Sequence, residues 1–580
     1  MENVFDPLTA YKEEYRDRFR EVAQTTFAEL SDEAKVDVEA NRETCRKIYA
    51  TEATLSSVKG RITCWTVICV VFWVAFAACA IAAIGNFTNG ETGIAVATCA
   101  GALVSLLLLF SLIHPHLKQL KNERAEKEAV IEELESEAWE QMESLNALYG
   151  WDTLPRMMTK AMPLIEFDPF FTTQRLDDLR RNYGWDDSFN DDRSVLSLLS
   201  GQICGNSFVI CRTRKMVMGR KTYHGSTTIY WTTYERDANG KTVPVQHSET
   251  LTASVTADYP EYYETTRLIY GNPAAPDLTF SRRKSGLASK DGTLSFFLAQ
   301  HKLKKKTRDL RRSDFAMMTN EEFEVSFDTS DRNDNQQFAL LFTPLAQESM
   351  LKLLKDKEEG YGDDFDFLKQ KRINTIIPDH IQPDSELDLE MDPSLFQSFD
   401  YEKAKADFLS ISVRNFRAIY FTFAPLLCVP LYQQMRPQSD IYSHGSKRHR
   451  SAFWEHESIA NYWGEDEFKD PSCVTHCILK THESAINGPH SSLSVSAYGY
   501  RTVQRCETFS RLGGDGRYHT VDVYWDEYIP VTGEGFIHIK EDNDTTPDTA
   551  TPQQRRDHIA AFLADAGCTE YRRHIASRMG

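Results

Sequence analysis

The chain has 580 residues, of which 41% are hydrophobic and 26% are charged, and its formal net charge is −19. This length suffices for several domains, and the aromatic content excludes a disordered chain. The acidic balance argues against a general nucleic-acid-binding protein, which would need a basic surface.

Residues 1–60 are predicted to form N-terminal helices in the cytoplasm. The first residues are polar and lack the apolar core of a secretory signal, so we expect none. Farther on, apolar side chains recur with heptad-like spacing at Val38, Cys45, Ile48 and Leu55. This spacing is typical of a helix that packs against another helix.

Residues 61–114 are predicted to form a hairpin of two transmembrane helices. The stretches 63–84 and 93–113 contain no charged residue, and each exceeds the roughly 18 residues that a helix needs to cross a bilayer. Basic residues flank the pair, at Lys59 and Arg61 before it and at Lys118 and Lys121 after it, and the turn between the stretches has none. The positive-inside rule therefore predicts that both flanks are cytoplasmic.

Residues 115–150 are predicted to form a helical stalk that resembles one strand of a coiled coil. Polar residues at three core positions, Arg124, Lys127 and Gln141, weaken the pattern. We expect this segment to pack antiparallel on residues 31–60; the alternative is pairing with a second copy of the chain, which would give a homo-oligomer. The apolar seam consists of Leu117, Leu120, Ile131, Leu134, Ala138, Leu145 and Leu148.

Beyond residue 150, short alternating runs predict a β-rich cytoplasmic body with two α+β domains, 151–383 and 384–540. Strands are expected over 206–220, 226–245, 249–259, 493–509, 517–531 and 535–541, with Asn239-Gly240 as a hairpin turn. The segment 322–356 is predicted to run strand, turn, strand and then a helix that begins after Thr343. Residues 419–432 are predicted to be a buried core segment, because they are too short to span a membrane.

Two acidic segments are predicted to connect these parts. In 384–392 acidic residues alternate with Leu387, Leu389 and Met391, which favours an edge strand or a charged tether. Residues 541–580 are predicted to be a linker followed by a C-terminal helix built on Ile559 and Phe562. The predicted fold is thus a membrane-anchored α+β protein.

Several body segments resemble an uncharacterised family of bacterial membrane-anchored proteins found in mycoplasmas and related Gram-positive bacteria. The resemblance rests on GQICGNSFVICRT, YGNPAAPDLTFSRR, FALLFTPLAQESMLKLL and GYGDDFDFLKQKRIN, and would cover roughly residues 165 to 540. It implies an N-terminal membrane hairpin, a large cytoplasmic domain and a place in the bacterial plasma membrane. It implies no catalytic residues.

Weak metal-site candidates come from two kinds of cluster. Carboxylates gather at Asp186 and Asp187 and at Asp363 and Asp364, where oxygen ligands could hold a divalent cation, although solvated turns explain them better. Cys473, Cys477 and His482 offer thiolate and imidazole ligands, but no second C-x-x-C pair accompanies them. No metal or other cofactor is therefore expected.

One basic block stands out in this acidic chain. It contains the candidate partner-binding residues Lys304, Lys305, Lys306, Arg311 and Arg312. Anionic lipid could face this block, although the stalk should hold the body beyond one Debye length, about 8 Å, from the bilayer. An acidic protein partner, an RNA or the chain's own acidic segment 384–392 could also face it, and a solvated helix face is the simplest explanation. Nucleic acid is the least favoured of these partners because few aromatic residues lie nearby.

The sequence favours a membrane-tethered interaction or scaffold module over an enzyme. It contains no G-x-S-x-G, H-E-x-x-H or P-loop motif. The alternatives are a metal-dependent hydrolase that uses the Asp clusters and an RNA-binding membrane tether.

Overall fold

We describe a computed structural model of the chain. It covers residues 4–88, 92–236, 241–288, 293–308, 317–385, 387, 389–437, 441–442, 449–487, 490–543 and 550–580, without the side chains of 95, 187, 306–308, 484–487 and 490. The fold is α+β, as predicted. It divides into two compact units: a body unit (Met1–Gln24, Trp151–Asp392 and Ile411–Gly580) and a hairpin unit (Thr25–Gly150 and Pro393–Ser410).

The hairpin unit contains the two long apolar helices that the sequence predicts. The first is α3 (Val38–Thr88); the second is continuous over Thr92–Asn146 and consists of α4 (Thr92–Leu108), the π-helical turn η2 (Leu109–Ile113) and α5 (His114–Asn146). Their most apolar windows have mean hydropathies of 2.8 and 2.4, and only 6% and 22% of these windows are buried. By length and composition both could cross a membrane.

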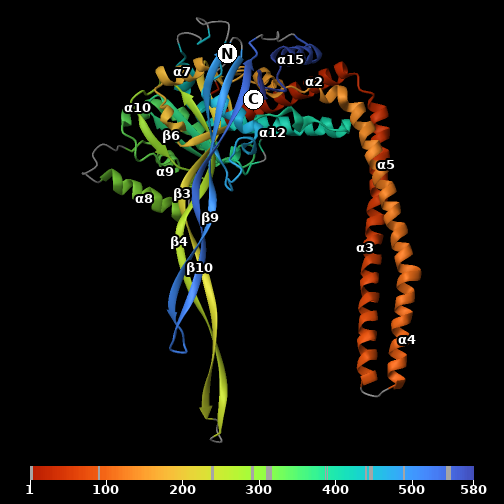
Figure 1. The fold of residues 1–580 in the computed structure, drawn as a ribbon. Coiled ribbons are helices and arrows are strands. Elements are labelled where there is room, and N and C mark those ends of the chain that lie inside the picture. The colour runs from red at the N-terminus through yellow and green to blue at the C-terminus, as the bar shows by residue number, and fades with distance from the viewer. Residues whose placement is uncertain are drawn as a thin grey trace. The chain divides into compact units, whose positions relative to one another are not determined.

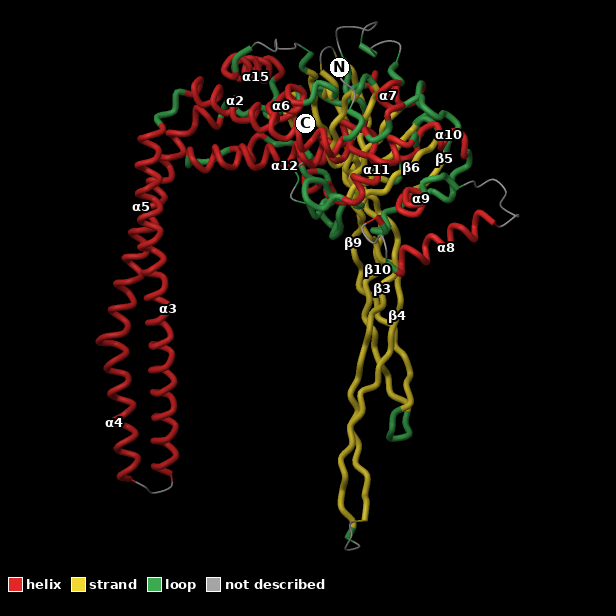
Figure 2. Tube along the Cα trace, turned by 180° about the vertical axis from the view of Figure 1, so that it is seen from behind, coloured by secondary structure: helices red, strands yellow, loops and turns green. Residues whose placement is uncertain are grey.

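In the hairpin unit the polar half of α3 packs along α5, and Figures 1 and 2 show the two helices side by side. Ile48 and Leu55 of α3 form an apolar cluster with Ile131 and Ala138 of α5. Gln141 fits into this seam because its side chain donates to the Thr44 hydroxyl at 3.1 Å. The seam thus accommodates Gln141, one of the polar residues that weaken the heptad pattern in the sequence.

The start of helix α12 (Tyr401–Leu427) and the turn η7 (Pro393–Phe396) complete the hairpin unit. Phe408 of α12 contacts Phe27 of α2 (Arg16–Ala34), with ring centroids 5.5 Å apart. Tyr149 packs against Phe396 and Phe408. Aromatic contacts therefore join α2, α12 and the segment after α5.

The body unit contains two antiparallel sheets. The seven-stranded sheet has the order β1-β2-β3-β4-β7-β6-β5, and the five-stranded sheet has the order β11-β12-β10-β9-β8. The strands are β1 (Ile165–Phe167), β2 (Arg193–Ile203), β3 (Asn206–Arg236), β4 (Thr242–Gly271), β5 (Thr279–Arg282), β6 (Phe365–Gln370), β7 (Ile373–Pro378), β8 (Ile478–Asn487), β9 (His490–Leu512), β10 (Tyr518–Glu541), β11 (Glu570–Arg572) and β12 (Ile575–Met579).

The seven-stranded sheet lies within the first predicted body domain, whereas the five-stranded sheet combines β8, β9 and β10 with β11 and β12 from the predicted C-terminal segment 541–580. Both sheets belong to the body unit. The boundary at residue 384 therefore stays a prediction. The predicted turn at Asn239-Gly240 lies outside the described residues, between two strands that pair as expected.

Four strands of the body unit are unusually long and run out from the sheets as two paired ribbons (Figures 1 and 2). Ribbon β3–β4 packs on ribbon β9–β10 through Ile229, Leu251, Val521 and Val523. Gly225 permits this approach, since a Cβ atom there would lie 2.1 Å from the carbonyl oxygen of Asp522. The ribbons thus stabilise each other with an apolar seam of their own.

The remaining helical elements of the body unit are short. They are α1 (Pro7–Ala10), η1 (Tyr11–Tyr15), α6 (Thr153–Ala161), α7 (Thr173–Arg181), η3 (Asp187–Asn190), α8 (Leu294–Arg308), α9 (Glu321–Phe327), α10 (Asn335–Leu341), α11 (Pro344–Lys355), η6 (Asp379–Ile381), α13 (Pro430–Gln434), α14 (Phe453–Trp463), η8 (Glu465–Glu467) and α15 (Pro552–Ala566). The predicted helix start at Thr343 is confirmed, because its side chain caps α11. Residues 419–432 are almost wholly buried, as predicted.

Two strands predicted within 322–341 are wrong, because both segments are helices, α9 and α10. Asn320 and Asp334 cap their first turns with side-chain oxygens. Phe323 and Phe327 recur four residues apart, which places both rings on one helix face in a shared aromatic cluster. Local capping and this spacing outweigh the alternation that suggested strands.

The described part of 384–392 contains no strand, so the edge-strand prediction is wrong there. Its apolar side chains Leu387, Leu389 and Met391 are buried as the alternation predicts. Met391 has a φ of 58°, in the left-handed region, which breaks an extended run. The C-terminal region also differs from the prediction, because strands β11 and β12 follow helix α15.

Candidate functional site

The body unit contains a cavity of about 710 Å³ bordered by α6, β1, α15 and the turn between β11 and β12. This volume lies in the range of small-molecule sites, roughly 300–1,000 Å³. Trp151 and Phe167 contribute aromatic surface. The charged and titratable lining residues are Asp152, Arg156, Lys160, Glu166, Asp168, Glu390, Arg555, Arg573 and His574.

Asp152 joins the two helices that carry the cavity's cations. It immediately precedes α6, and its carboxylate accepts a hydrogen bond from Arg156, one turn later, at 3.2 Å. The same oxygen accepts a hydrogen bond from Arg555 of α15 at 2.7 Å. Burial alone would raise the pKa of Asp152, but the two guanidinium groups hold that pKa below its usual value.

The turn between β11 and β12 presents two basic residues in an unusual backbone conformation. Arg572 pairs with Ile575, so Arg573 and His574 form a two-residue turn, with φ values of 48° and 60°. Such a turn favours Asn-Gly, because a left-handed non-glycine residue costs on the order of 1 kcal/mol or more. The fold therefore holds two strained residues at the wall of the cavity.

Arg573 is held by buried groups, and His574 lies near two carboxylates. The Arg573 guanidinium donates to the carbonyl of Leu198 and lies 3.7 Å from the buried carboxylate of Glu455. Burial lowers the pKa of His574, although the carboxylates of Asp152 and Asp542 oppose the shift. His574 is therefore mainly neutral near pH 7.

A buried polar chain lies beside His574. Asp542 accepts hydrogen bonds from His558 at 2.7 Å and from the Tyr571 hydroxyl at 2.9 Å. Burial and the Asp542 carboxylate raise the pKa of Tyr571, which keeps its proton. Because this proton is directed to Asp542, the Tyr571 oxygen accepts the longer contact, 3.4 Å, from His574 Nδ1.

Two carboxylates in the cavity wall have a guanidinium partner that is not among the lining residues. Asp168 receives two hydrogen bonds from the buried Arg175, at 2.9 and 2.8 Å. Glu390 pairs with the buried Arg572 at 2.8 Å. Their charges are thus compensated within the wall.

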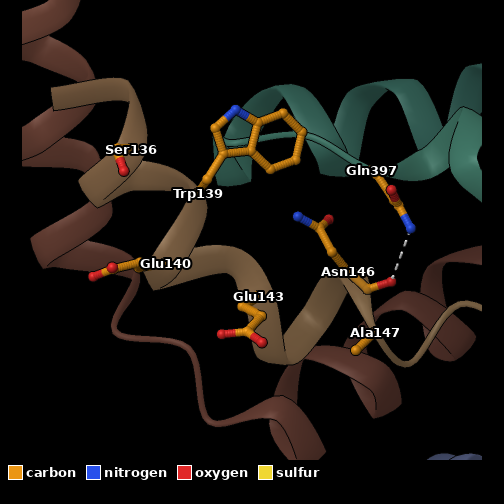
Figure 3. A pocket seen from close by; sticks show the side chains of 7 residues that line it. All are labelled: Ser136, Trp139, Glu140, Glu143, Asn146, Ala147 and Gln397. Carbon is orange, nitrogen blue, oxygen red and sulfur yellow. Dashed lines mark hydrogen bonds between the residues drawn. The ribbon is translucent and has the colours of Figure 1, made fainter. Parts of the chain in front are cut away.

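A second, shallower hollow of about 440 Å³ lies in the hairpin unit (Figure 3). The Asn146 side chain donates a hydrogen bond to the Ser398 carbonyl at 3.0 Å and accepts one from the Ser398 backbone amide at 3.2 Å. The charged residues that line the hollow are Glu140 and Glu143, and the Glu140 side chain points away from Gln397 in Figure 3. No cation or buried titratable group faces this hollow from the described lining, so the body cavity is the better candidate.

The predicted carboxylate clusters have other roles where the structure describes them. Asp186 caps the turn η3 by accepting from the Ser188 backbone at 3.0 Å. Asp363 pairs with the buried Arg282, and Asp364 pairs with His380. The side chain of Asp187 lies outside the described residues.

The predicted cysteine cluster is a buried thiol pair. The sulfurs of Cys473 and Cys477 lie 3.6 Å apart, and both cysteines are free. His482 pairs opposite Ser494 in the β8–β9 ladder. Within the described residues, no group of three or more His, Cys, Asp or Glu side chains could hold a metal ion.

The basic block lies only partly in the described structure. Lys304 belongs to α8 and forms an ion pair with Glu321 at 2.8 Å, and Lys305 is exposed. The side chain of Lys306 and all of Arg311 and Arg312 lie outside the described residues. Lys304 therefore contacts a neighbouring helix, and the partner of the whole block stays a prediction.

Sequence reasoning missed the cavity, whose principal residues are Asp152, Arg156, Arg555, Arg573 and His574. They come from opposite ends of the body segments and share no motif. The one local signal was a short Tyr-Arg-Arg-His-Ile run after α15, in a segment predicted to be a linker and helix. No family model, curated protein or solved structure matches the chain. The resemblance to a bacterial membrane-anchored family therefore remains a prediction.

Proposed function

We propose that this protein is a membrane-anchored binding module, with α3 and the α4–η2 segment as its anchor and the cavity of the body unit as its binding site. The exposure of two long apolar windows carries the proposal. In water each exposed Val or Ile forfeits about 1.5–3 kcal/mol that burial would provide. Val74, Ile81 and Ile84 of α3 are each more than half exposed, which a bilayer would relieve.

The basic flanks give the proposed orientation. Lys59 precedes the apolar part of α3 and pairs with Glu128 of α5, so these ends of the two helices lie on the same side. The positive-inside rule then places them in the cytoplasm of a bacterial cell, with the turn between α3 and α4 on the outer side. The body would face the cytoplasm.

The cavity supports binding more directly than either alternative function. The metal-dependent hydrolase would need converging carboxylates, but Asp363 and Asp364 are paired with Arg282 and His380. The RNA tether would need an open basic surface, but Lys304 is paired with Glu321. A scaffold role for the basic block is compatible with the cavity, because the two lie on different elements.

Membrane fractionation tests the anchor. The full chain should remain in the membrane pellet after extraction at pH 11 and should dissolve in detergent. A matched variant in which a short polar linker replaces residues 61–114 should appear in the supernatant. Release of the full chain by alkaline carbonate would contradict membrane anchoring.

A further inference from the structure

We infer that Cys473 and Cys477 form a reversible disulfide when the protein meets hydrogen peroxide. The two thiols lie in the segment between η8 and β8 of the body unit. This oxidation site goes beyond the binding module proposed above, and its test uses detergent-solubilised protein, so it does not depend on the membrane anchor. It rests on the distance between the sulfurs, the glycine opposite them and the contacts of the loop that joins them.

The two sulfurs are already close to bonding distance. Sγ of Cys473 and Sγ of Cys477 lie 3.6 Å apart, and both cysteines are free. A disulfide bond is about 2.05 Å long, so the sulfurs need to approach each other by only about 1.5 Å. The fold has already brought the two ends of the loop 473–477 together. Disulfide formation therefore costs little further loop-closure entropy.

The neighbouring strand β9 leaves space for both sulfurs. A Cβ atom at Gly499 of β9 would lie 2.4 Å from Sγ of Cys473 and 2.9 Å from Sγ of Cys477, and both distances are shorter than real Cβ contacts. Any other residue at this position would therefore displace the thiol pair. A buried cysteine commonly serves as a small apolar side chain, but a gap that admits two sulfurs in contact favours a role for the pair.

The two thiols differ in their access to solvent. Cys473 is 7% exposed, whereas Cys477 is fully buried. Burial and the neighbouring Cys473 thiol raise the pKa of Cys477 to about 12, so Cys477 keeps its proton near pH 7. The Lys469 ammonium, which also pairs with Asp466, interacts electrostatically with Cys473. Because a nearby cation favours the reactive thiolate, Cys473 is the sulfur that a small oxidant meets first.

The oxidation proceeds in two balanced steps. The Cys473 thiolate attacks one oxygen of hydrogen peroxide, the O–O bond breaks, and the other oxygen leaves as water with the proton of the thiol. The product is a sulfenic acid at Cys473. The Cys477 sulfur then attacks the Cys473 sulfur, and the hydroxyl group leaves with the Cys477 proton as a second water. Two thiols and one peroxide thus give one disulfide and two waters.

The loop 473–477 connects the two sheets of the body unit. The Thr475 hydroxyl accepts a hydrogen bond from the Tyr500 amide of β9 at 3.0 Å and another from the Tyr262 hydroxyl of β4 at 3.1 Å. The Val474 amide donates to the Tyr500 carbonyl at 2.9 Å. A disulfide would close a covalent ring over these residues and restrict the opening of their hydrogen bonds. Oxidation therefore fastens the connection between the sheets.

Mass spectrometry tests the inference directly. Trypsin releases residues 470–480 as one peptide that contains both cysteines. The purified full chain in detergent is treated with hydrogen peroxide, unfolded in the presence of N-ethylmaleimide to block free thiols, and digested. The peptide should lack two hydrogen atoms and carry no maleimide, and dithiothreitol should restore two thiols that react. Cys211, an equally buried cysteine, should carry maleimide with and without peroxide.

Two single substitutions test the order of the steps. In Cys477→Ser the sulfenic acid at Cys473 has no thiol beside it, so dimedone should trap it. In Cys473→Ser dimedone should label Cys477 severalfold less, because Cys477 is fully buried. Amide exchange at Val474 should be severalfold slower in oxidised than in reduced wild type, and peroxide should not change it in Cys477→Ser. Unchanged melting temperatures show that the variants keep the fold.

Four results would overturn the inference. The first is a peptide that keeps both reactive thiols under peroxide that oxidises the exposed Cys506. The second is a disulfide that forms only after the chain is unfolded in urea, because the fold would then not present the pair to the oxidant. Equal trapping by dimedone in the two variants would contradict the assignment of Cys473 as the attacking thiol. Exchange at Val474 that is unchanged or faster after oxidation would contradict the fastening of the loop.

Discussion

The Asp152 carboxylate accepts a hydrogen bond at 2.7 Å from Arg555, a residue 403 positions farther along the chain. This pair ties the start of α6 to α15 and closes one side of the cavity in the body unit. Neither residue belongs to a motif, so the site is created by the fold.

Asp152→Asn should destabilise the body unit at pH 7 by about 1–3 kcal/mol, because two guanidinium groups lose their shared carboxylate. The pKa of Asp152 is lowered in the folded state. The contribution of Asp152 to the free energy of unfolding is therefore fully present above the unfolded-state pKa near 3.8. This contribution is lost as the pH falls through the lower pKa of the folded state. Thermal melting should show a gap between wild type and variant that narrows in acid.

The matched control for this variant is Asp557→Asn. Asp557 is an exposed carboxylate on α15 that accepts a hydrogen bond from Gln553, one turn earlier, at 2.9 Å. This change should shift the stability by less than about 0.5 kcal/mol. Equal effects of the two substitutions would contradict the role given to Asp152.

Lys369 should make the body more stable at alkaline pH. Its ammonium nitrogen is buried, donates to the carbonyls of Ala274 and Lys371, and burial lowers its pKa to about 7 from the usual 10.5. Between these values the unfolded chain binds a proton that the folded chain does not. Stability should therefore rise with pH over this range, by at most about 1.4 kcal/mol per pH unit.

Lys369→Met should flatten that slope, since methionine does not titrate. In the variant two carbonyls also lose a donor, which lowers the free energy of unfolding by the same amount at every pH. The slope of the unfolding free energy against pH, measured from pH 7 to 10, therefore reports the titration of Lys369 alone. If wild type and variant have parallel profiles, Lys369 does not change its protonation on folding.

Gly225→Ala should separate the two ribbons. The new Cβ would meet the Asp522 carbonyl oxygen, a backbone atom that cannot rotate away. We expect a loss of about 1–3 kcal/mol, as for other overpacked sites. Gly219→Ala is the control in the same strand, because its Cβ would meet the flexible carboxylate end of Glu261. Urea titration should rank the two variants in this order; the reverse order would contradict the ribbon packing.

Reversal of the basic block to glutamate at Lys304, Lys305, Lys306, Arg311 and Arg312 should remove a charge-dependent partner. The fold should persist, because the exposed Lys304–Glu321 pair contributes only about 0.2–1 kcal/mol. A salt-sensitive pull-down from membranes, with thermal melting alongside, checks both points. Identical partners and melting would mean that the block is a solvated face.

The sequence patterns that could be interpreted correctly were long and locally repeated. The uncharged stretches predicted two long apolar helices, and alternation predicted the strands that became β3, β4, β9 and β10. Short elements failed where capping decided the outcome: Asn320 and Asp334 start helices in segments whose alternation suggested strands.

The candidate site could not be predicted because its parts have no local signal. Arg573 and His574 occupy a turn that normally favours Asn-Gly, so turn propensity argues against the structure that forms. Asp363 was one of the weak metal-site candidates, and its carboxylate instead pairs with the buried guanidinium of Arg282. Pairing over long sequence distances determined both outcomes.

The orientation of the anchor is the central claim, and one labelling experiment tests it most directly. Thr88 is exposed at the end of α3 and Glu140 is exposed on α5. A membrane-impermeant maleimide should label Thr88→Cys in intact cells and leave wild type and Glu140→Cys unlabelled. After lysis, Glu140→Cys and the exposed native Cys506 should react, which confirms that the reagent is active. Labelling of Glu140→Cys but not of Thr88→Cys in intact cells would contradict the proposed orientation, and labelling of neither before lysis would contradict an outward-facing turn.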